Sequence, residues 1–315
     1  MTSGERNCLI VDKMHDSIVP LLEGINLRVD YRPDISRQEI IDIIRNYSGL
    51  VIRSKTTVDD QLLESANKLE FVARAGAGID KLDVPAIESR GIKILNAAEG
   101  NRDALAEHTV GMLLGLLNNI VKSDREIREG VWARESNRGY ELNQMTVGIV
   151  GYGHMGQAFA QRLKAFGCRV ISYDLYKKGF ADDYCEEVDE QKLFDESDVL
   201  SLHVPLLSEN KGIFNEAYFN RFKKNIYFLN TARGELAPVK DIVKCLKSGK
   251  IVGAGLDVLE IEDVTRLTHE FSEEYDYLKG SGRVILTPHV AGWTYESYEK
   301  INKVLVEKIK QELEN

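Results

Sequence analysis

The sequence predicts an α/β protein with two Rossmann-like, doubly wound domains, one of them inserted into the other. The chain has 315 residues, which is too long for one ordinary hydrophobic core. Short apolar runs alternate with helical patterns in two successive series, and one last helical segment is expected to return to the first domain. We therefore predict a discontinuous first domain, 1–97 with 290–315, and an inserted second domain, 98–289. Hinges are expected at 96–101 and 288–291.

The first series covers the first hundred residues. Five short apolar or β-rich runs predict strands at 8–11, 27–31, 49–53, 69–74 and 92–96. Residues 40–47 have helical spacing. Strands that alternate with helices predict a parallel sheet, because parallel neighbours need a crossover connection.

A long apolar segment connects the two series. Residues 104–121 are apolar over much of a helical surface, which predicts a helix buried between two layers. The following stretch, 125–141, is rich in charge but contains Trp132 and Tyr140. We expect it to form an arm that packs on a partner subunit in a homodimer.

The second series has the alternation of a doubly wound nucleotide-binding domain. Its strands are predicted at 146–150, 169–173, 199–203, 226–230, 253–257 and 284–286. The last helix is predicted at 295–313.

Composition excludes several classes of function. The formal charge is -9, so the chain would repel a phosphodiester backbone and is not expected to bind nucleic acid. No signal peptide and no run of about 20 uncharged apolar residues is present, so no membrane span is expected. The cysteines form no CxxC pair and no metal-ligand spacing, which predicts reduced thiols in a cytoplasmic protein without a metal site. They are Cys8, Cys168, Cys185 and Cys245.

A glycine motif follows the predicted strand at 146–150. Gly151 permits a tight turn, Gly153 lets the backbone approach a pyrophosphate, and Gly156 allows close helix–strand packing. The helix that follows would present the amides of His154 and Met155 to the phosphates.

An acidic residue ends the next predicted strand. Asp174 lies 18 positions after Gly156, where its carboxylate can accept hydrogen bonds from the adenosine ribose hydroxyls. The same charge would repel a 2′-phosphate. The predicted cofactor is therefore NAD rather than NADP.

Three polar residues follow later strands or turns. Hydride transfer to or from a 2-hydroxy acid needs a cation for the substrate carboxylate, a group titrating near neutrality for the hydroxyl proton, and a carboxylate that orients that group. Arg233, His289 and Glu262 supply one of each. Glu260 is a rival partner for His289, and spacing from Asp257 favours Glu262.

Taken together, these motifs resemble those of a known protein family. The chain resembles the D-isomer-specific 2-hydroxyacid dehydrogenase family in 151–156 with Asp174, in 230–235 and in 287–289, and the likeness extends over nearly the whole chain. Supporting matches are 202–206 and 256–258.

The resemblance implies roles for individual residues. Arg233 would bind and polarise the substrate, His289 would be the acid and base, and Glu262 would pair with it. Family members usually carry a proline after this glutamate, whereas Asp263 stands here. The resemblance also implies further residues along the cofactor: His203, Val204, Pro205, Thr231, Ala232, Asp257 and Gly292.

Two segments of the first domain contain residues that are predicted to bind the substrate. Arg53 with Ser54 follows one predicted strand, and Arg74 ends another. The amides of Ala77 and Gly78 then offer a small anion-binding nest. Within the family, these segments resemble the short phosphoglycerate dehydrogenases that lack a C-terminal regulatory domain, where the first arginine contacts the substrate phosphate.

The resulting hypothesis is NAD-dependent oxidation of 3-phospho-D-glycerate to 3-phosphohydroxypyruvate, the first step of serine biosynthesis. Arg134, in the charged arm, is expected to reach a neighbouring subunit's site, and feedback control by serine is not expected. The alternatives are another enzyme of the family, such as a glyoxylate or hydroxypyruvate reductase, and an NAD-sensing binding protein like the corepressors that share this fold.

Overall fold

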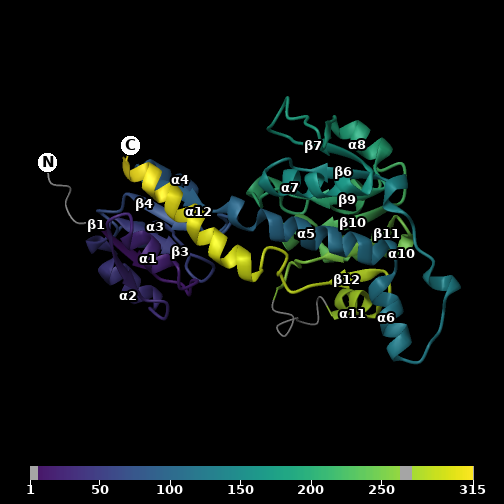
Figure 1. Cartoon of the computed structure of the whole chain (residues 1–315), viewed down its shortest axis with the longest axis horizontal. Coiled ribbons are helices and arrows are strands. Elements are labelled where there is room, and N and C mark those ends of the chain that lie inside the picture. The colour runs from purple at the N-terminus through teal and green to yellow at the C-terminus, as the bar shows by residue number, and fades with distance from the viewer. Residues whose placement is uncertain (1–5, 263–271, 315) are drawn as a thin grey trace. The chain divides into compact units, whose positions relative to one another are not determined.

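The computed structural model describes residues 6–262 and 272–314. The chain divides into two compact units, each with its own sheet and helices (Figure 1). Unit 1 comprises Met1–Asn101 with Trp293–Asn315, and unit 2 is Arg102–Gly292. The domain boundaries expected from sequence, 97/98 and 289/290, fall a few residues earlier at both junctions.

Unit 1 contains five parallel strands in the order β2-β1-β3-β4-β5. Its elements are β1 (Arg6–Ile10), α1 (Ile18–Glu23), β2 (Leu27–Tyr31), α2 (Arg37–Ile43), β3 (Gly49–Ile52), α3 (Asp60–Leu63), β4 (Phe71–Arg74), α4 (Val84–Ser89), β5 (Lys93–Asn96) and α12 (Tyr295–Glu314). A short 3₁₀ turn, Ile44–Asn46, extends α2.

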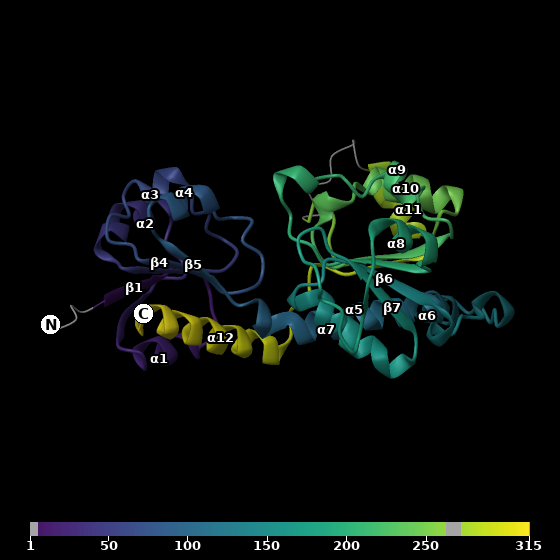
Figure 2. The same cartoon turned by 90° about the horizontal axis from the view of Figure 1, so that it is seen from above.

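Short polar side chains cap the N-termini of helices α2, α3 and α4 in unit 1. Ser36 and Glu39 form a reciprocal capping box at α2, and Asp59 and Asp83 cap α3 and α4. Helices α2, α3 and α4 cover one face of the sheet, whereas α1 and α12 cover the other (Figure 2). Both faces are therefore buried, as parallel strands require.

Unit 2 contains seven parallel strands in the order β12-β11-β10-β9-β6-β7-β8. Its elements are α5 (Ala98–Leu117, which starts in unit 1), α6 (Ile120–Arg128), β6 (Thr146–Val150), α7 (His154–Leu163), β7 (Arg169–Tyr173), β8 (Glu186–Glu187), α8 (Glu190–Glu196), β9 (Val199–Leu202), α9 (Glu216–Phe219), β10 (Ile226–Asn230), α10 (Val239–Ser248), β11 (Ile251–Leu256), α11 (Ser272–Gly280) and β12 (Val284–Leu286). Short 3₁₀ turns lie at Glu135–Asn137, Leu142–Gln144, Lys164–Phe166, Ser208–Asn210 and Gly234–Leu236.

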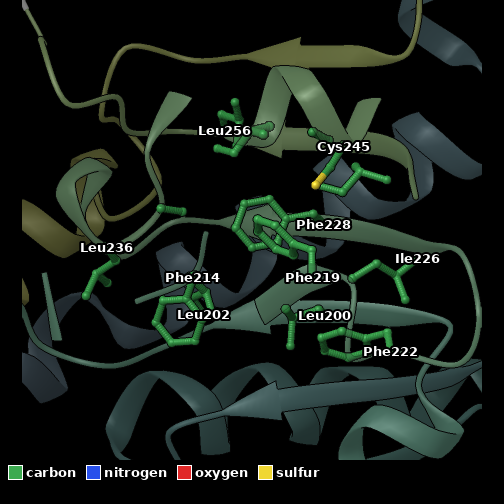
Figure 3. Close-up of a cluster of buried hydrophobic side chains, with 14 of the residues drawn as sticks. Leu200, Leu202, Phe214, Phe219, Phe222, Ile226, Phe228, Leu236, Cys245 and Leu256 are labelled. Carbon is green, nitrogen blue, oxygen red and sulfur yellow. The ribbon is translucent and has the colours of Figure 1, made fainter. Parts of the chain in front are cut away.

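The larger core of unit 2 lies between the sheet and helices α8, α9, α10 and α11. Five phenylalanines lie among its aliphatic side chains, and Phe219 packs edge-on against Phe228 with ring centroids 4.9 Å apart (Figure 3). The opposite face is covered by α5 and α7. Both faces of this sheet are thus buried as well.

The strand orders confirm the predicted fold class of two doubly wound α/β layers. In such sheets the strand order reverses at one point, and ligands bind outside the carboxyl ends of the strands there. The reversal falls between β1 and β3 in unit 1 and between β6 and β9 in unit 2. A ligand is therefore expected near the carboxyl ends of the strands at these two switch points.

The predicted helix 104–121 was wrong at both ends. Helix α5 starts six residues earlier, where Glu99 lies in the first turn and pairs with Lys308 at 2.9 Å. It ends at Leu117, because Asn119 adopts a left-handed conformation with φ +52°. The Asn118 side chain donates to the Leu114 carbonyl at 3.1 Å. An apolar pattern that continues past residue 117 hides this break.

No single helix in the described chain has both the length and the apolar character to cross a membrane; α5 and α6 reach them only jointly, across a 62° bend. All four cysteines are free thiols. Burial raises the pKa of Cys8 and of Cys185 to about 12, so neither is a thiolate at neutral pH.

Candidate functional site

The glycine turn after β6 has the geometry that a dinucleotide needs. Gly151 has φ +92°, and a Cβ there would lie 2.6 Å from the His203 carbonyl. A Cβ at Gly156 would lie 2.2 Å from the Gly151 carbonyl, so only glycine permits this approach of α7 to the turn. Gly153 caps α7 and has no described atom within 4 Å of its Cβ position, which leaves room for a phosphate beside the amides of His154 and Met155.

Asp174 lies directly after β7 beside this turn. Its carboxylate accepts hydrogen bonds of 2.9 Å from the amides of Tyr152, Tyr176 and Lys177. Burial alone would raise the pKa of Asp174, but these amides and the Lys177 charge outweigh it and hold the pKa below its usual value. The group is therefore a fixed anion with lone pairs left for ribose hydroxyls.

The segment after β9 forms the other side of the switch point. The His203 amide donates to the Val150 carbonyl at 2.8 Å, and its imidazole lies 2.8 Å from the Ser201 hydroxyl and against Phe159. Burial lowers the pKa of His203 to about 3, which favours the neutral imidazole near neutral pH. Val204 next to it is half-buried and Pro205 is exposed.

The turn after β10 carries Arg233. The Asn230 side chain braces this turn, since it accepts from the Ala232 amide at 3.0 Å and donates to the Arg233 carbonyl at 2.9 Å. Thr231 and Ala232 are buried, and Arg233 is half-buried with Nη1 donating to the Ala232 carbonyl at 2.7 Å. The guanidinium is thus held at the carboxyl end of a central strand.

The structure brings His289 and Glu262 together and separates them from Glu260. His289 Nδ1 lies 2.6 Å from Glu262 Oε1, with both side chains about half exposed. Glu260 instead accepts from the Val239 amide at 2.8 Å, at the start of α10. Its carboxylate is therefore engaged with a helix terminus. Asp263, the departure from the family pattern, lies outside the described residues.

Asp257 organises the turn that carries His289. It is buried, and its carboxylate accepts from the Thr287 hydroxyl at 2.5 Å and from the amides of Val290 and Ala291 at 2.9 Å each. Its carbonyl accepts from the His289 amide at 2.8 Å. The resemblance assigned Asp257 to the cofactor, and in the structure this side chain also holds residues 289–291, next to half-buried Gly292.

In unit 1, Asp12 and Arg53 follow the two strands of the switch point. The Asp12 carboxylate is buried and accepts from the amides of Arg53 at 2.5 Å and Lys55 at 3.1 Å. Sequence reasoning missed Asp12, although an aspartate directly after a predicted strand was an available signal.

The Arg53 guanidinium lies on an aromatic surface. Its carbon is 4.0 Å from the Trp293 ring centroid and 5.1 Å from that of Tyr298. Burial lowers the pKa of Arg53 from its ordinary value. Within 6–262 and 272–314, no hydrogen bond or ion pair reaches the guanidinium, so its edge is available to an anion. Trp293 directly follows the predicted cofactor residue Gly292 in the sequence, but no sequence pattern predicted that its ring would stack on Arg53.

Arg74 ends β4, next to Arg53. Its Nε donates to the Arg53 carbonyl at 3.1 Å, and its guanidinium occupies the space that a side chain at Gly76 would need. The amides of Ala77 and Gly78 have no hydrogen-bond acceptor in the described parts of the chain, as an anion-binding nest requires.

Two other residues that were predicted to bind the substrate, Ser54 and Arg134, have exposed side chains in this structure. The Ser54 side chain is exposed, and its carbonyl accepts from Lys81. Arg134 is exposed in the segment after α6, where Trp132 has 84% of its surface exposed. Within residues 6–262 and 272–314, no hydrogen bond or ion pair joins the side chain of Ser54 or Arg134 to another candidate group of its own unit.

Comparison with known proteins agrees with these features. Residues 110–291 match the model of the D-isomer specific 2-hydroxyacid dehydrogenase NAD-binding domain. The chain is 36% identical over 279 residues to the hydroxypyruvate reductase of Thermotoga maritima, covering 89% of each chain. It is 31% identical over 303 residues to the D-3-phosphoglycerate dehydrogenase of Archaeoglobus fulgidus, covering 96% of this chain but 56% of that protein. A solved D-2-hydroxyisocaproate dehydrogenase is 27% identical, with a TM-score of 0.80 over 96% of this chain and 94% of that one.

The chain belongs to the D-isomer specific 2-hydroxyacid dehydrogenase family. It is an NAD-dependent oxidoreductase of that family, with the cofactor bound by unit 2. The chain spans about half the length of the phosphoglycerate dehydrogenases that it matches.

Proposed function

We propose that this protein oxidises 3-phospho-D-glycerate to 3-phosphohydroxypyruvate with NAD⁺ as the acceptor. When bound in unit 2, NAD⁺ would supply the acceptor for the hydride from carbon 2 of the substrate, and the hydroxyl proton would go to the protein. The products are the 2-keto acid, NADH and one proton. Serine biosynthesis is the use we propose for this reaction.

The proton goes to His289 in this proposal. Its Nδ1 is engaged with Glu262 at 2.6 Å, which leaves Nε2 as the nitrogen that accepts the hydroxyl proton. The Glu262 carboxylate favours the imidazolium that forms. Arg233 binds the substrate carboxylate and polarises the carbonyl oxygen that develops at carbon 2.

The observation that carries the phosphate assignment is the environment of Arg53. A half-buried guanidinium, stacked on Trp293 and without an acceptor in the described chain, is a costly arrangement unless an anion completes it. The nest at Ala77 and Gly78, beside Arg74, supplies a second anion site in the same unit. A substrate with a carboxylate and a phosphate matches two such sites.

A second candidate is the reduction of hydroxypyruvate. The Thermotoga maritima hydroxypyruvate reductase is 36% identical and matches over 89% of both chains, whereas the phosphoglycerate dehydrogenases match over about half their length. Such a substrate has no phosphate, so its carboxylate would be the one anionic group for the cations of the site to bind.

Turnover of a substrate panel separates these candidates. We expect kcat/KM for 3-phospho-D-glycerate to exceed that for D-glycerate, D-lactate and D-2-hydroxyglutarate, and Arg53→Gln to remove most of that preference. Lys81→Gln serves as the matched control, because it removes a neighbouring exposed cation. Equal rates on unphosphorylated acids, or an Arg53→Gln variant with unchanged preference, would overturn the phosphate assignment.

The proton-transfer assignment has its own test. His289→Ala should abolish turnover while NADH still binds, measured by NADH fluorescence. An active His289→Ala variant would contradict the assignment. Tight NADH binding by the wild type without turnover of any 2-hydroxy acid would instead favour an NAD-sensing binding protein.

We also propose a cytoplasmic homodimer. Helix α6 and the segment after it expose large apolar side chains, which a second copy would cover. These are Ile120, Val121, Ile127, Val131, Trp132 and Tyr140. Light scattering of the wild type and of Trp132→Glu tests this, and a wild-type monomer would contradict it.

A further inference from the structure

A second histidine lies behind the turn that carries His289. His108, on α5, has its Nε2 3.1 Å from the Thr287 hydroxyl and 3.7 Å from Asp257 Oδ1. One quarter of its side chain is exposed, whereas the Asp257 side chain is almost completely buried. His108 therefore faces the carboxylate that organises the turn.

The hydrogen bonds in this cluster have defined directions. The Thr287 hydroxyl has one hydrogen, and the 2.5 Å contact assigns it to the Asp257 carboxylate, which has no hydrogen to donate. The hydroxyl oxygen must then accept from His108, so Nε2 of His108 carries a hydrogen. The result is a directed chain from His108 through Thr287 to Asp257.

This chain acts on the backbone of His289. His289 is a non-glycine residue with φ +53°, a conformation that persists only when surrounding contacts hold it. Its amide donates to the Asp257 carbonyl, and the next two amides donate to the Asp257 carboxylate. Any loosening of Asp257 therefore reaches the position of the His289 imidazole.

We propose that His108 is a positioning residue for the acid–base step. It orients the Thr287 hydroxyl toward Asp257, and through Asp257 it keeps the His289 imidazole in the geometry for proton transfer. This inference rests on the proposed role of His289. It does not depend on which 2-hydroxy acid is the substrate.

The test compares two substitutions of His108 in the full-length protein. His108→Gln keeps an N–H donor close to the Nε2 position, whereas His108→Leu removes it. We expect His108→Leu to lower kcat roughly 3- to 10-fold, with KM and NADH affinity little changed, and His108→Gln to restore most of the loss. Glu107→Gln, on the exposed side of α5, is the matched control and should behave as the wild type.

Further measurements distinguish positioning from a general loss of structure. The primary deuterium isotope effect on kcat should rise in His108→Leu, measured with the best 2-hydroxy acid substrate labelled at carbon 2, because the chemical step becomes slower relative to product release. Thr287→Val should lower kcat similarly, and the double variant should be no worse than either single one.

Each outcome decides the proposal. Wild-type kcat in His108→Leu, or losses that simply add in the double variant, would overturn it. An equal loss in His108→Gln and His108→Leu, without a change in isotope effect, would also overturn it, since a structural role alone would produce that. Failure of the proposed function appears separately, as turnover by His289→Ala.

Discussion

His289 Nδ1 lies 2.6 Å from Glu262 Oε1, whereas the carboxylate of Glu260, two residues earlier, accepts from the Val239 amide at 2.8 Å. The two glutamates therefore have different partners and should respond differently to the same substitution. This pair provides a matched experiment within one short segment.

We expect Glu262→Gln to lower kcat by about 10- to 100-fold with little change in thermal stability, because the neutral amide no longer favours the imidazolium. Glu260→Gln should leave kcat close to the wild type but destabilise the fold by about 0.5–1 kcal/mol, since it weakens the charge at the α10 N-terminus. Steady-state kinetics and urea unfolding measure the two effects. A larger catalytic loss in Glu260→Gln would reverse the assignment.

The glycine turn offers a second matched pair. Gly156→Ala places a Cβ 2.2 Å from the Gly151 carbonyl and should destabilise the protein by about 1–3 kcal/mol. Gly153→Ala meets no described atom within 4 Å, so the fold should keep its stability while NADH affinity falls. Thermal unfolding with and without NADH separates the two. Unchanged NADH binding in Gly153→Ala would show that the cofactor does not approach this backbone.

The aromatic support of Arg53 predicts an effect on KM. Trp293→Leu removes the ring 4.0 Å from the guanidinium and should raise KM for the phosphorylated substrate roughly 3- to 20-fold, with kcat less affected, because a cation–π contact is worth about 0.5–2 kcal/mol. Trp293→Phe should retain most of the affinity. Tyr295→Leu, a nearby and almost fully exposed aromatic residue, is the control. The same KM rise for D-glycerate would show that the contact does not act through the phosphate.

The lowered pKa of His203 predicts a pH dependence of stability. Its pKa is about 3 in the folded protein and about 6.5 in an unfolded chain, so the unfolded state binds the extra proton between these values. The contribution of His203 to the free energy of unfolding is therefore fully present above pH 6.5. It falls on acidification below that pH by up to about 1.4 kcal/mol per pH unit. His203→Gln should lose less stability than the wild type between pH 7 and pH 4.5 in urea titrations. Parallel curves for the two proteins would contradict this, because acid-sensitive carboxylates such as Asp174 are common to both.

Features of the fold and the site that depend on residues close together in the sequence could be predicted, whereas contacts between distant residues could not. The glycine turn and Asp174 follow from local chemistry, so their spacing alone predicted a dinucleotide site. The end of α5 at Leu117 was missed, because a left-handed asparagine leaves no mark on an apolar pattern.

Contacts between distant segments were the harder part. Spacing favoured Glu262 but could not exclude Glu260, since the choice depends on where α10 begins. Trp293, near the end of the chain, stacks on Arg53, which directly follows β3. No local sequence pattern predicts a contact between residues so far apart. The network of His108, Thr287 and Asp257 likewise exists only after folding.

In the turn after β12, the backbone is held by hydrogen bonds, whereas the His289 side chain is partly exposed. The amides of three consecutive residues, His289, Val290 and Ala291, all donate to Asp257, whereas 43% of the His289 side chain remains exposed. In hydrogen–deuterium exchange these amides should behave like those of a central strand rather than of a surface loop. In the proposed reaction, the imidazole would release one substrate and receive the next without local unfolding, so the rate of substrate exchange would be independent of the stability of this turn.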